Sequence, residues 1–454
     1  MENNRRKFIK TGLLAASALP VHASFGNRQN MISYDTTGFM EPARQLPIVK
    51  ETDVIVCGGG PAGIAAAIAS ARNGAKTTLI EMYGCLGGIW TTGLLSYIID
   101  YEKKPGIMKE LVHNLEKSDA QHFAKVYDAE LMKWTLDKMC LDAGVDIRLH
   151  TKVTAAYKNS KNNLEYITTE SFSGREAWKA KVFIDTTGNG QLASLAGCNF
   201  AIGHPVSGKT QPMSLMAMLT GLKESELNNG GLTGKIGYPT KEEKNFLYSE
   251  IERAGLKASY TKPTLFNVRE GLVAMMANHQ YGVSILDANQ VSKATIEARA
   301  EINNMVNGLR SLGGVWSNVR LVSTGAQIGV REGRRIVGLY TITKEDLING
   351  AQFDDGVCKV DFGVDVHSLE RDSGGGYSNH GVPSKPYEIP LRALIAKDVN
   401  GLMMAGRCIS GDFFAHASYR VTGNAVAMGE AAGQVAAQAS LENKLPQEIK
   451  YRKA

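Results

Sequence analysis

Apolar residues gather in short continuous runs near the start of the chain. The first clear run, at 54–57, leads directly into a cluster of glycines, and a stretch rich in alanine and isoleucine then extends to about Asn73. A continuous apolar run of this length is typical of a strand buried in a parallel sheet. The small-residue stretch, which Gly74 ends, predicts a helix from about 62 to 73. A further apolar run at 77–80 completes a predicted strand–helix–strand unit.

The same periodicities continue through the rest of the chain. Helical patterns and short apolar runs predict helices at 127–143, 286–312 and 424–441, and strands at 145–150, 153–157, 164–171, 179–184 and 401–404. Segments rich in glycine, serine and proline, or in mixed polar and aromatic residues, predict loops at 230–234, 371–390 and 412–423. Strands that alternate with helices are typical of an α/β protein.

The glycine cluster has the spacing of a dinucleotide-binding loop. Gly58, Gly60 and Gly63 satisfy G-x-G-x-x-G between a predicted strand and a predicted helix. In this setting the first glycine makes a tight turn, the second lets a pyrophosphate approach, and the third lets the helix pack on the strand. The helix start offers free N–H groups to the phosphates, and Glu81 stands where an acid binds a ribose hydroxyl. The alternative is a glycine-rich turn with a structural role only.

Composition places the chain among ordinary globular proteins and argues against nucleic-acid binding. The 454 residues are 43% hydrophobic and 21% charged, which suits two or three domains. The formal net charge of +6 is concentrated at the ends, because residues 1–23 and the tail from Lys444 each carry a net charge of +3. The segment between them is about neutral, whereas a nucleic-acid binder needs a basic face.

The first 23 residues contain the three regions of an export signal in order. Residues 4–10 resemble the twin-arginine pattern, an apolar stretch follows from Thr11, and 21–23 offer a small-x-small cleavage site. The alternative is a basic amphipathic start to a cytosolic protein. We expect residues 1–23 to be a signal that exports the folded protein to the bacterial periplasm, and 24–50 to be a lead-in. No later window approaches about 18 uninterrupted apolar residues, so we expect no stable membrane insertion of the mature chain.

Four further motifs carry a resemblance to a known family. The chain has E-x-x-x-C-L-G-G-x-x-T from Glu81, D-T-T-G from Asp185, R-x-x-R-R-I-x-G from Arg331 and A-G-R from Ala405. These motifs resemble FAD-dependent oxidoreductases of the glutathione-reductase-like superfamily, and specifically the bacterial family grouped with heterodisulfide-reductase-subunit-A-like flavoproteins. The resemblance implies FAD as the cofactor. It also implies an α/β fold in which a Rossmann-like FAD-binding domain of glutathione-reductase type carries an inserted α+β substrate or cap domain.

The resemblance divides the mature chain into two domains. It implies a discontinuous FAD-binding domain of residues 51–97, 127–200, 320–345 and 387–443, and a substrate or cap domain of residues 201–319 and 346–386. The chain has no second G-x-G-x-x-G unit. We therefore expect no separate NAD(P)H domain, so electrons must come from the substrate or from another redox partner.

Position within these motifs implies which residues contact FAD. Most of them are small, which lets a cofactor approach the backbone. The start of the last helix is expected to face the pyrimidine edge of the flavin, where its positive dipole end stabilises an anionic reduced flavin by about 0.3–1 kcal/mol. The cofactor-binding residues implied in this way are Gly58, Gly60, Pro61, Ala62, Gly63, Glu81, Cys85, Gly87, Gly88, Thr92, Val153, Thr187, Gly188, Gly406, Arg407, Gly423, Asn424 and Ala425.

Two residues just before the last helix are the candidates for catalysis. His416 belongs to a residue type that accepts a hydroxyl proton while hydride leaves for flavin N5. Arg420 can add a positive charge beside the flavin or hold a substrate anion. The alternatives are a histidine that bonds only the loop backbone and an arginine that is solvated or structural. The remaining polar candidates are His380 and Tyr377 as catalysts, and Arg331 and Arg334 as structural ion-pair or substrate-carboxylate residues.

The six cysteines are scattered, and none has the C-x-x-C spacing of a redox or metal centre. Cys85 has no second cysteine nearby, which argues against the dithiol mechanism of the disulfide reductases. We interpret it as a small residue packed beside the flavin, while a covalent flavin link, or a disulfide between other cysteines, stays open. No iron–sulfur cluster or other metal site is expected.

Together the motifs predict an FAD-dependent oxidoreductase that acts on a small organic substrate by hydride transfer to or from flavin N5. A carbohydrate-derived alcohol is one option for the substrate. The alternative is an electron-transfer flavoprotein subunit of a larger redox complex, which would expose a flavin edge instead of closing a pocket beside it. A non-enzymatic carbohydrate-binding protein on a retained flavin fold is a third option. The returning D-T-T-G and A-G-R segments argue against an NAD-dependent dehydrogenase.

Overall fold

The computed structural model describes residues 41–123, 126–223, 240–371 and 376–451, together with Gly38 and Ser225. Residues Leu46–Ala454 form one compact unit. The predicted signal segment, most of the predicted lead-in and the predicted loop at 230–234 lie outside the described residues.

The larger sheet has a parallel centre. Its strands are β1 (Ile48–Cys57), β2 (Thr77–Ile80), β5 (Asp146–Arg148), β6 (Lys152–Lys158), β7 (Leu164–Ser171), β8 (Gly174–Asp185) and β19 (Leu402–Met404). β1 runs parallel to β2 and β8, and β2 runs parallel to β5. The order across the sheet is β5-β2-β1-β8-β7-β6, and β19 also pairs with β8. The end of β1 and all of β2 are buried, as expected for continuous apolar strands in a parallel sheet.

One edge of this sheet collects the ends of three strands that are distant in the sequence. β8 pairs antiparallel with β7 along its first half and parallel with β19 at its end. Thr186 N donates to the Cys57 carbonyl oxygen at 2.9 Å, and Ala405 N donates to the Asp185 carbonyl oxygen at 3.1 Å. Ligands of open α/β sheets bind outside the carboxyl ends of the strands. The glycine loop, the D-T-T-G segment and the A-G-R segment therefore meet where a ligand is expected.

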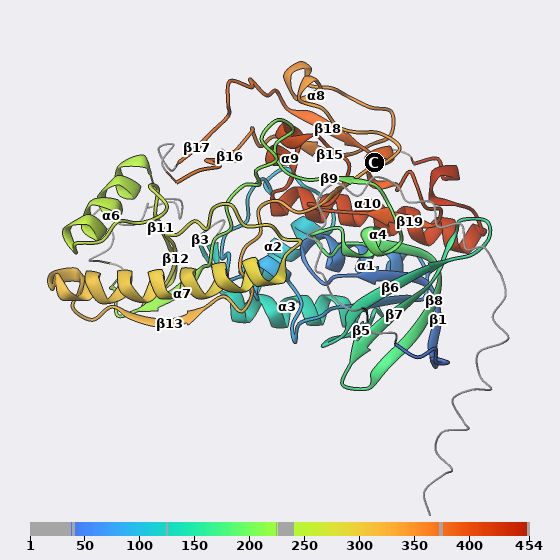
Figure 1. Cartoon of the computed structure of the whole chain (residues 1–454), viewed down its shortest axis with the longest axis horizontal. Coiled ribbons are helices and arrows are strands. Elements are labelled where there is room, and N and C mark those ends of the chain that lie inside the picture. The colour runs from blue at the N-terminus through green and yellow to red at the C-terminus, as the bar shows by residue number, and fades with distance from the viewer. Residues whose placement is uncertain are drawn as a thin grey trace, which may run out of the picture. The chain divides into compact units, whose positions relative to one another are not determined.

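Two helices of small residues pack closely beside this sheet (Figure 1). They are α1 (Pro61–Arg72) and α10 (Thr422–Glu442). A Cβ on Gly429 would overlap the carbonyl oxygen of Ala62, and one on Gly433 would overlap that of Ala66. Glycine at these two positions is therefore what lets the backbones of the helices touch. This contact fixes the start of α10 next to the start of α1.

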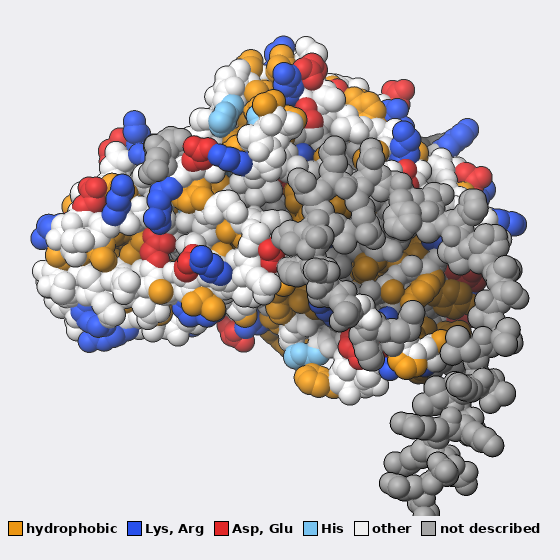
Figure 2. Space-filling view, in the orientation of Figure 1, with side chains coloured by type: hydrophobic (Ala, Val, Ile, Leu, Met, Phe, Trp, Pro, Cys, Tyr) orange, Lys and Arg blue, Asp and Glu red, His pale blue; other side chains and the backbone are white. Residues whose placement is uncertain are grey.

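A second, antiparallel sheet has a hydrophobic core of its own. In spatial order its strands are β11 (Thr264–Arg269), β12 (Leu272–Met276), β10 (Ala217–Thr220) and β13 (Arg320–Thr324). The helices α6 (Lys241–Arg253) and α7 (Ala288–Ser311) bury Leu247, Ile302 and Leu309 in this core. Figure 1 shows α7 lying along the sheet. On the face drawn in Figure 2, basic and acidic side chains are interspersed over these elements.

Short elements complete the described chain. They are η1 (Gly88–Trp90), α2 (Ile107–Lys117), β3 (Gln121–Phe123), β4 (Val126–Tyr127), α3 (Ala129–Asp142), α4 (Gln191–Leu195), β9 (Phe200–Ala201), η2 (Gly314–Trp316), β14 (Arg335–Ile336), α8 (Lys344–Asn349), β15 (Gly356–Val360), β16 (Val366–His367), β17 (Tyr377–Ser378), β18 (Tyr387–Pro390), η3 (Leu391–Leu394), α9 (Phe413–Tyr419) and η4 (Pro446–Glu448).

The structure confirms most of the predicted elements and corrects two predicted loops. The predicted helix at 424–441 is α10, which begins two residues earlier, while β5 is shorter and β8 longer than predicted. The predicted loop at 412–423 contains α9 instead. Asp412 is its N-cap, since Oδ1 accepts a hydrogen bond from Ala415 N at 2.7 Å. The predicted loop at 371–390 contains β17 and β18.

The part of the chain that the structure describes contains neither a helix that could span a membrane nor a group of side chains that could bind a metal ion. None of its helices combines the length and the apolar character needed to cross a bilayer. No group of three or more His, Cys, Asp and Glu side chains there could hold a metal ion. All six cysteines are free thiols, so the disulfide that the sequence left open is not formed in this structure.

Candidate functional site

The glycine loop between β1 and α1 contains two glycines that the fold requires and one that it does not. Gly58 has a φ of +104°, and a Cβ there would lie 2.6 Å from the carbonyl oxygen of Thr186. A Cβ on Gly63 would overlap the carbonyl oxygen of Gly58. Gly60, in contrast, has a φ of −74°, and a Cβ there meets no atom within 4 Å. Open space at this position is what an approaching pyrophosphate needs.

The start of α1 lies beside this open space without a side-chain cap. Gly60 is the N-cap residue, and Pro61, which has no N–H, occupies the first turn together with Ala62. The N–H groups at a helix start have no intrahelical partners, and they form the positive end of the helix dipole. The loop therefore offers an anion both hydrogen-bond donors and a favourable field.

Glu81 is buried at the end of β2 and bonds to the glycine loop. Its Oε2 accepts a hydrogen bond from Gly59 N at 2.6 Å, and its Oε1 accepts one from Tyr83 N at 2.8 Å. Burial raises the pKa of the carboxyl group, although these hydrogen bonds oppose the shift. Thr151 N donates to the Glu81 carbonyl oxygen at 2.9 Å, which brings the start of β6, with Val153, to the same place.

The second glycine pair packs on the first loop. Gly87 N donates to the Gly59 carbonyl oxygen at 2.7 Å, and a Cβ on Gly88 would lie 3.0 Å from the Cα of Gly60. Thr92 Oγ1 donates to the Gly88 carbonyl oxygen at 2.7 Å. Both glycine-rich segments therefore border the open position over Gly60.

Arg407 ties the D-T-T-G segment to the A-G-R segment. Its Nε donates to the Gly188 carbonyl oxygen at 3.1 Å, and its Nη2 donates to Asn189 Oδ1 at 2.8 Å. Its Nη1 bonds to the Val330 carbonyl oxygen. Thr187, next to Gly188, bonds to the aspartate that ends β8. Three segments remote in sequence are thus held together by one guanidinium.

The start of α10 presents buried polar atoms that lack partners. Gly406 lies against α1 and α10, where a Cβ would be 3.2 Å from that of Ala62 and 3.8 Å from that of Ala425. Gly423 N donates to the Ile99 carbonyl oxygen at 3.0 Å. Thr422 Oγ1 and Asn424 Nδ2 are buried without a hydrogen-bond partner.

These residues fit the cofactor that the motifs imply. Buried polar groups are normally hydrogen-bonded, so the orphaned atoms at the start of α10 indicate a missing polar partner. A dinucleotide with a polar ring edge would bond to these atoms and place its pyrophosphate over Gly60, with a ribose near Glu81. We refer below to the glycine loop, Glu81, the second glycine pair and the start of α10 as the cofactor cradle.

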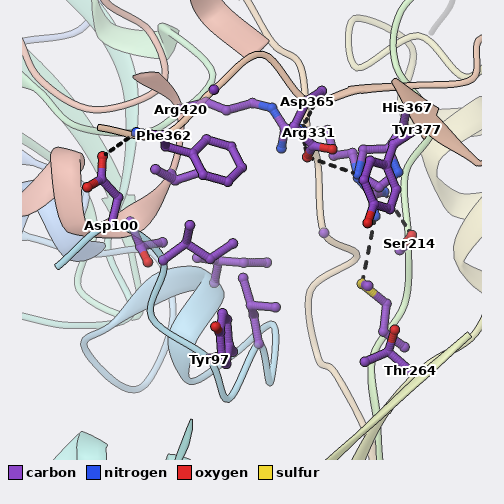
Figure 3. Close-up of a pocket in the computed structure, with 18 of the residues that line it drawn as sticks. Tyr97, Asp100, Ser214, Thr264, Arg331, Phe362, Asp365, His367, Tyr377 and Arg420 are labelled. Carbon is purple, nitrogen blue, oxygen red and sulfur yellow. Dashed lines mark hydrogen bonds and ion pairs between the residues drawn. The ribbon is translucent and has the colours of Figure 1, made fainter. Parts of the chain in front are cut away.

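A cavity of about 820 Å³ adjoins the cofactor cradle (Figure 3). This volume is typical of a small-molecule site. Ile89, which follows the second glycine pair, and Thr422, at the start of α10, line the cavity together with Arg407 of the A-G-R segment. Much of the remaining lining comes from the antiparallel sheet and from residues 361–365, 367 and 377–379. Its bulky apolar and aromatic side chains include Tyr97, Met216, Tyr260, Phe266, Met276 and Phe362.

A half-buried aspartate on the cavity wall bonds to an arginine and a histidine. Arg420 Nη2 donates to the Asp365 carbonyl oxygen at 2.8 Å and to its Oδ2 at 3.1 Å. His367 Nε2 lies 3.3 Å from the same Oδ2. Burial alone would raise the pKa of Asp365, but His367, Arg420 and Arg331 hold it below its usual value. The carboxylate is therefore ionised at neutral pH.

His367 is a neutral histidine, and one of its ring nitrogens has no hydrogen-bond partner. Burial and the charge of Arg331 lower its pKa to about 4, although Asp365 raises it. If Nε2 carries the proton toward Asp365, Nδ1 keeps its lone pair, and Nδ1 has no hydrogen-bond partner. His367 N donates to Gln211 Oε1 at 3.1 Å, and Tyr377 is its register partner across β16 and β17. The backbone of His367 is therefore held in place from two sides.

Arg331 is a half-buried cation without a carboxylate partner. Its Nη1 donates to the Pro212 carbonyl oxygen and to Ser214 Oγ, both at 2.8 Å, and its Nη2 lies 3.9 Å from Met276 Sδ. Within the described chain no carboxylate oxygen lies within 4.0 Å of its guanidinium nitrogens. Burial and the charge of Arg420 lower its pKa to about 10, so it stays protonated at neutral pH.

The structure separates the catalytic candidates that the sequence grouped together. Arg420 and Tyr377 line the cavity, whereas His416 and His380 do not. His416 is fully buried in α9, where its ring meets the edge of Tyr419 at 5.5 Å between centroids. This position does not support the role of proton acceptor predicted for His416, because a substrate in the cavity would not reach the ring. His380 is exposed.

Two further side chains have structural surroundings. Arg334 Nη1 donates to the Asn189 carbonyl oxygen at 3.1 Å, and its guanidinium lies over the ring of Phe200. Cys85 is half-buried, with its Sγ 3.7 Å from Thr91 Oγ1. Burial raises the pKa of Cys85, so the thiol form is favoured over the nucleophilic thiolate.

Asp365 and His367 were not among the site residues predicted from the sequence, although the sequence contains a pattern that points to them. They are two residues apart and separated by the buried Val366. On an extended chain, residues i and i+2 point to the same side, so this D-x-H pattern predicts a carboxylate beside an imidazole. No local pattern could have found Ser214 or Tyr260, because the antiparallel sheet brings them to the cavity from distant sequence.

The buried His416 gives a prediction about the pH dependence of stability. Burial lowers its pKa well below the usual 6.5, and the charges of Arg335, Arg420 and Arg407 lower it further. The unfolded chain therefore takes up this proton at a higher pH than the folded chain, and stability falls as the pH drops below 6.5. Between about pH 7.5 and pH 5.5, we expect the wild type to lose about 1.4 kcal/mol more unfolding free energy than His416→Phe. Urea unfolding at both pH values measures this difference, and equal losses would contradict it.

Comparison with known proteins identifies a family match over nearly the whole described chain. The model of a family described as FAD dependent oxidoreductase matches residues 53–454. The mitochondrial dihydrolipoyl dehydrogenase of Pisum sativum is 38% identical over 81 residues, which are 18% of this chain. This match spans only 15% of the length of the pea enzyme.

Solved structures resemble the chain over a longer span but at low identity. A geranylgeranyl bacteriochlorophyll reductase-like protein from Thermoplasma acidophilum is 14% identical, with a TM-score of 0.43 over 87% of this chain and 78% of that one. A flavin-dependent brominase is 12% identical, with a TM-score of 0.47 over 86% of this chain and 80% of that one.

Proposed function

We propose a function for this chain from its family: it belongs to the FAD-dependent oxidoreductases. In this proposal the cofactor cradle holds FAD, and a small organic molecule reacts in the adjoining cavity. FAD, when bound, takes up or gives up a hydride at N5. The residues of this chain bind and orient the substrate and hold its proton.

One observation carries the proposal. The cavity of about 820 Å³ has a wall made partly by cradle segments and partly by the charged cluster of Arg331, Asp365, His367 and Arg420. A site that combines an apolar cavity, a few convergent polar groups and shifted pKa values is typical of an active site. An electron-transfer subunit has no need of such a cavity, so the observation favours an enzyme over that alternative.

We propose that His367 accepts the proton of the substrate hydroxyl group. The imidazole is neutral at pH 7, because its pKa is lowered to about 4, and its Nδ1 is without a partner. Asp365 orients the ring and stabilises the imidazolium that forms when the proton arrives. In oxidation of an alcohol, His367 would accept the hydroxyl proton and FAD would supply the hydride acceptor, so that a carbonyl compound would remain. Arg420 keeps the charge of Asp365 in place.

The finer features that the sequence resemblance implies belong to the same proposal. The antiparallel strands β6 and β7 on a parallel sheet support a glutathione-reductase-type FAD domain, and the core of the β10–β13 sheet supports an inserted cap domain. The free, scattered cysteines argue against iron–sulfur chemistry like that of the heterodisulfide reductases. The basic start at 4–10 supports twin-arginine export to the periplasm.

Anaerobic mixing tests the proposed function. The FAD-loaded protein is mixed in the absence of oxygen with a panel of hydroxy acids, sugars and sugar alcohols, and the flavin absorbance is followed. We expect at least one small molecule to bleach the flavin in a saturable manner. Reduction only by a reduced protein partner, and by no member of the panel, would favour the electron-transfer alternative.

A further inference from the structure

The cavity wall contains a half-buried positive charge that has no carboxylate partner. Arg331 is held by the Pro212 carbonyl oxygen and by Ser214 Oγ, which are both neutral acceptors. These bonds use Nη1, while Nη2 has only the weak contact with Met276 Sδ at 3.9 Å. Removing a charge even partly from water costs free energy unless the charge is paired. The Nη2 side of the guanidinium is therefore available to bind an anion from outside the chain.

The surrounding charges do not neutralise Arg331. Asp365 is the carboxylate of this cluster, and it already bonds to Arg420 at 3.1 Å and lies 3.3 Å from His367. Because His367 is neutral at pH 7, the cluster carries one positive charge in excess. Three other acids line the cavity: Asp100 pairs with Lys104 at 3.1 Å, Asp361 pairs with Lys103 at 3.3 Å, and the exposed Glu102 accepts a hydrogen bond from Tyr101 N at 3.2 Å.

The missing anion is not the pyrophosphate of the cofactor. Donors for a pyrophosphate are supplied by the glycine loop and by the start of α1. Arg331 bonds instead to residues 212 and 214 and contacts Met276 on β12. These neighbours belong to the second sheet or to the segment that leads into it. Arg331 therefore stands on the wall that faces a substrate.

The rest of the cavity suits an apolar body. Figure 3 shows Tyr97 and Phe362 across the cavity from Arg331 and His367. Tyr97 stacks on Phe266, with 5.3 Å between ring centroids. Met216 and Met276, which also line the cavity, are side chains that adapt to the shape of an apolar ligand.

We propose that Arg331 binds a substrate carboxylate, and that the substrate is a carboxylic acid with a largely apolar or aromatic body. The inference rests on the proposed function, since it names the substrate class of the same cavity. A planar guanidinium with a free edge matches a carboxylate in shape and charge. This anchor would place the carbon chain between the apolar wall and His367.

Equilibrium binding of phenylacetate and phenylacetamide to the FAD-loaded protein tests the inference. The two ligands have the same shape and differ by one charge, and neither has a hydroxyl group to be oxidised. Calorimetric titration should give at least a tenfold smaller Kd for phenylacetate. In Arg331→Gln, phenylacetate should bind at least tenfold more weakly, while phenylacetamide changes by less than about threefold. Arg331→Lys should fall between, because it keeps the charge and loses the planar fork.

Arg320→Gln is the matched control. Arg320 is exposed on β13 of the antiparallel sheet and does not line the cavity. Its replacement therefore removes one positive charge from the protein and leaves the cavity lining unchanged. It should leave both Kd values unchanged, and FAD affinity should be unchanged in all three variants.

Three results would each overturn the proposal. They are equal binding of the acid and the amide, equal losses for both ligands in Arg331→Gln, and no saturable binding of phenylacetate. Gluconate, a carboxylate with a polar body, should bind more weakly than phenylacetate. Tighter binding of gluconate would contradict the inference that the substrate has a largely apolar body.

The outcome is separable from that of the proposed function. A chain that does not bind FAD, or that no small molecule reduces, fails the proposed function. A chain that binds FAD and is reduced, yet does not distinguish phenylacetate from phenylacetamide, fails only this inference.

Discussion

Replacement of Gly60 with alanine is expected to abolish tight FAD binding and to leave the fold intact. Gly60 has a φ of −74°, which any residue adopts, and a Cβ there meets no atom within 4 Å. The unfolding free energy of the apoprotein should therefore be unchanged or raised by about 0.4–1 kcal/mol. The new methyl group would occupy the space through which the pyrophosphate approaches. We expect the Kd for FAD to rise by about 100-fold, which corresponds to about 2.7 kcal/mol.

Gly63→Ala is the contrasting variant. A Cβ on Gly63 would overlap the carbonyl oxygen of Gly58, so the loop and the helix would have to move apart. It should lose FAD binding and also about 1–3 kcal/mol of stability. Urea unfolding of the apoproteins and titration of FAD by fluorescence quenching measure both quantities. If Gly60→Ala binds FAD as the wild type does, the loop is a structural turn and the cofactor lies elsewhere.

His367→Gln is expected to slow reduction of the flavin by substrate about 10²–10⁴-fold with little change in FAD affinity. Glutamine can still donate a hydrogen bond to Asp365 but cannot accept a proton. Because a base must be neutral to act, and the pKa of His367 is lowered to about 4, the wild-type rate should be flat from about pH 5 to pH 8. Stopped-flow absorbance under anaerobic conditions measures the rate.

His416→Gln separates the two histidines. His416 lies outside the cavity lining, so this variant should reduce its flavin within about threefold of the wild-type rate. A loss in His416→Gln as large as that in His367→Gln would restore the role that the sequence predicted for His416. An unchanged rate in His367→Gln would remove His367 from the chemistry.

Local patterns predicted the parts of this fold that local physics determines. The glycine spacing at 58–63 and the apolar runs beside it require a tight turn between strand and helix, and the structure contains that turn. Gly429 and Gly433 let the predicted last helix pack closely against α1. The D-T-T-G and A-G-R segments meet through Arg407, as expected for two loops at one edge of a sheet.

The cavity could not be predicted in the same way, because tertiary packing creates it. Arg331 looked like a structural ion-pair or substrate-carboxylate residue, and only the fold shows that no carboxylate of the described chain reaches it. Asp365 lies in a short extended segment without a strong pattern, and its partner Arg420 is 55 residues away. The position of His416 could not be predicted for a related reason: Asp412 caps a helix that turns the imidazole into the core.

The visible absorption spectrum of the purified protein tests the central claim most directly. If the cradle holds FAD, the protein should be yellow, with the two flavin absorption bands, and denaturation should release about one FAD per chain. Gly60→Ala purified in the same way should be colourless or nearly so. A wild-type protein that is colourless, and stays colourless after incubation with excess FAD and removal of the free cofactor, would contradict the account.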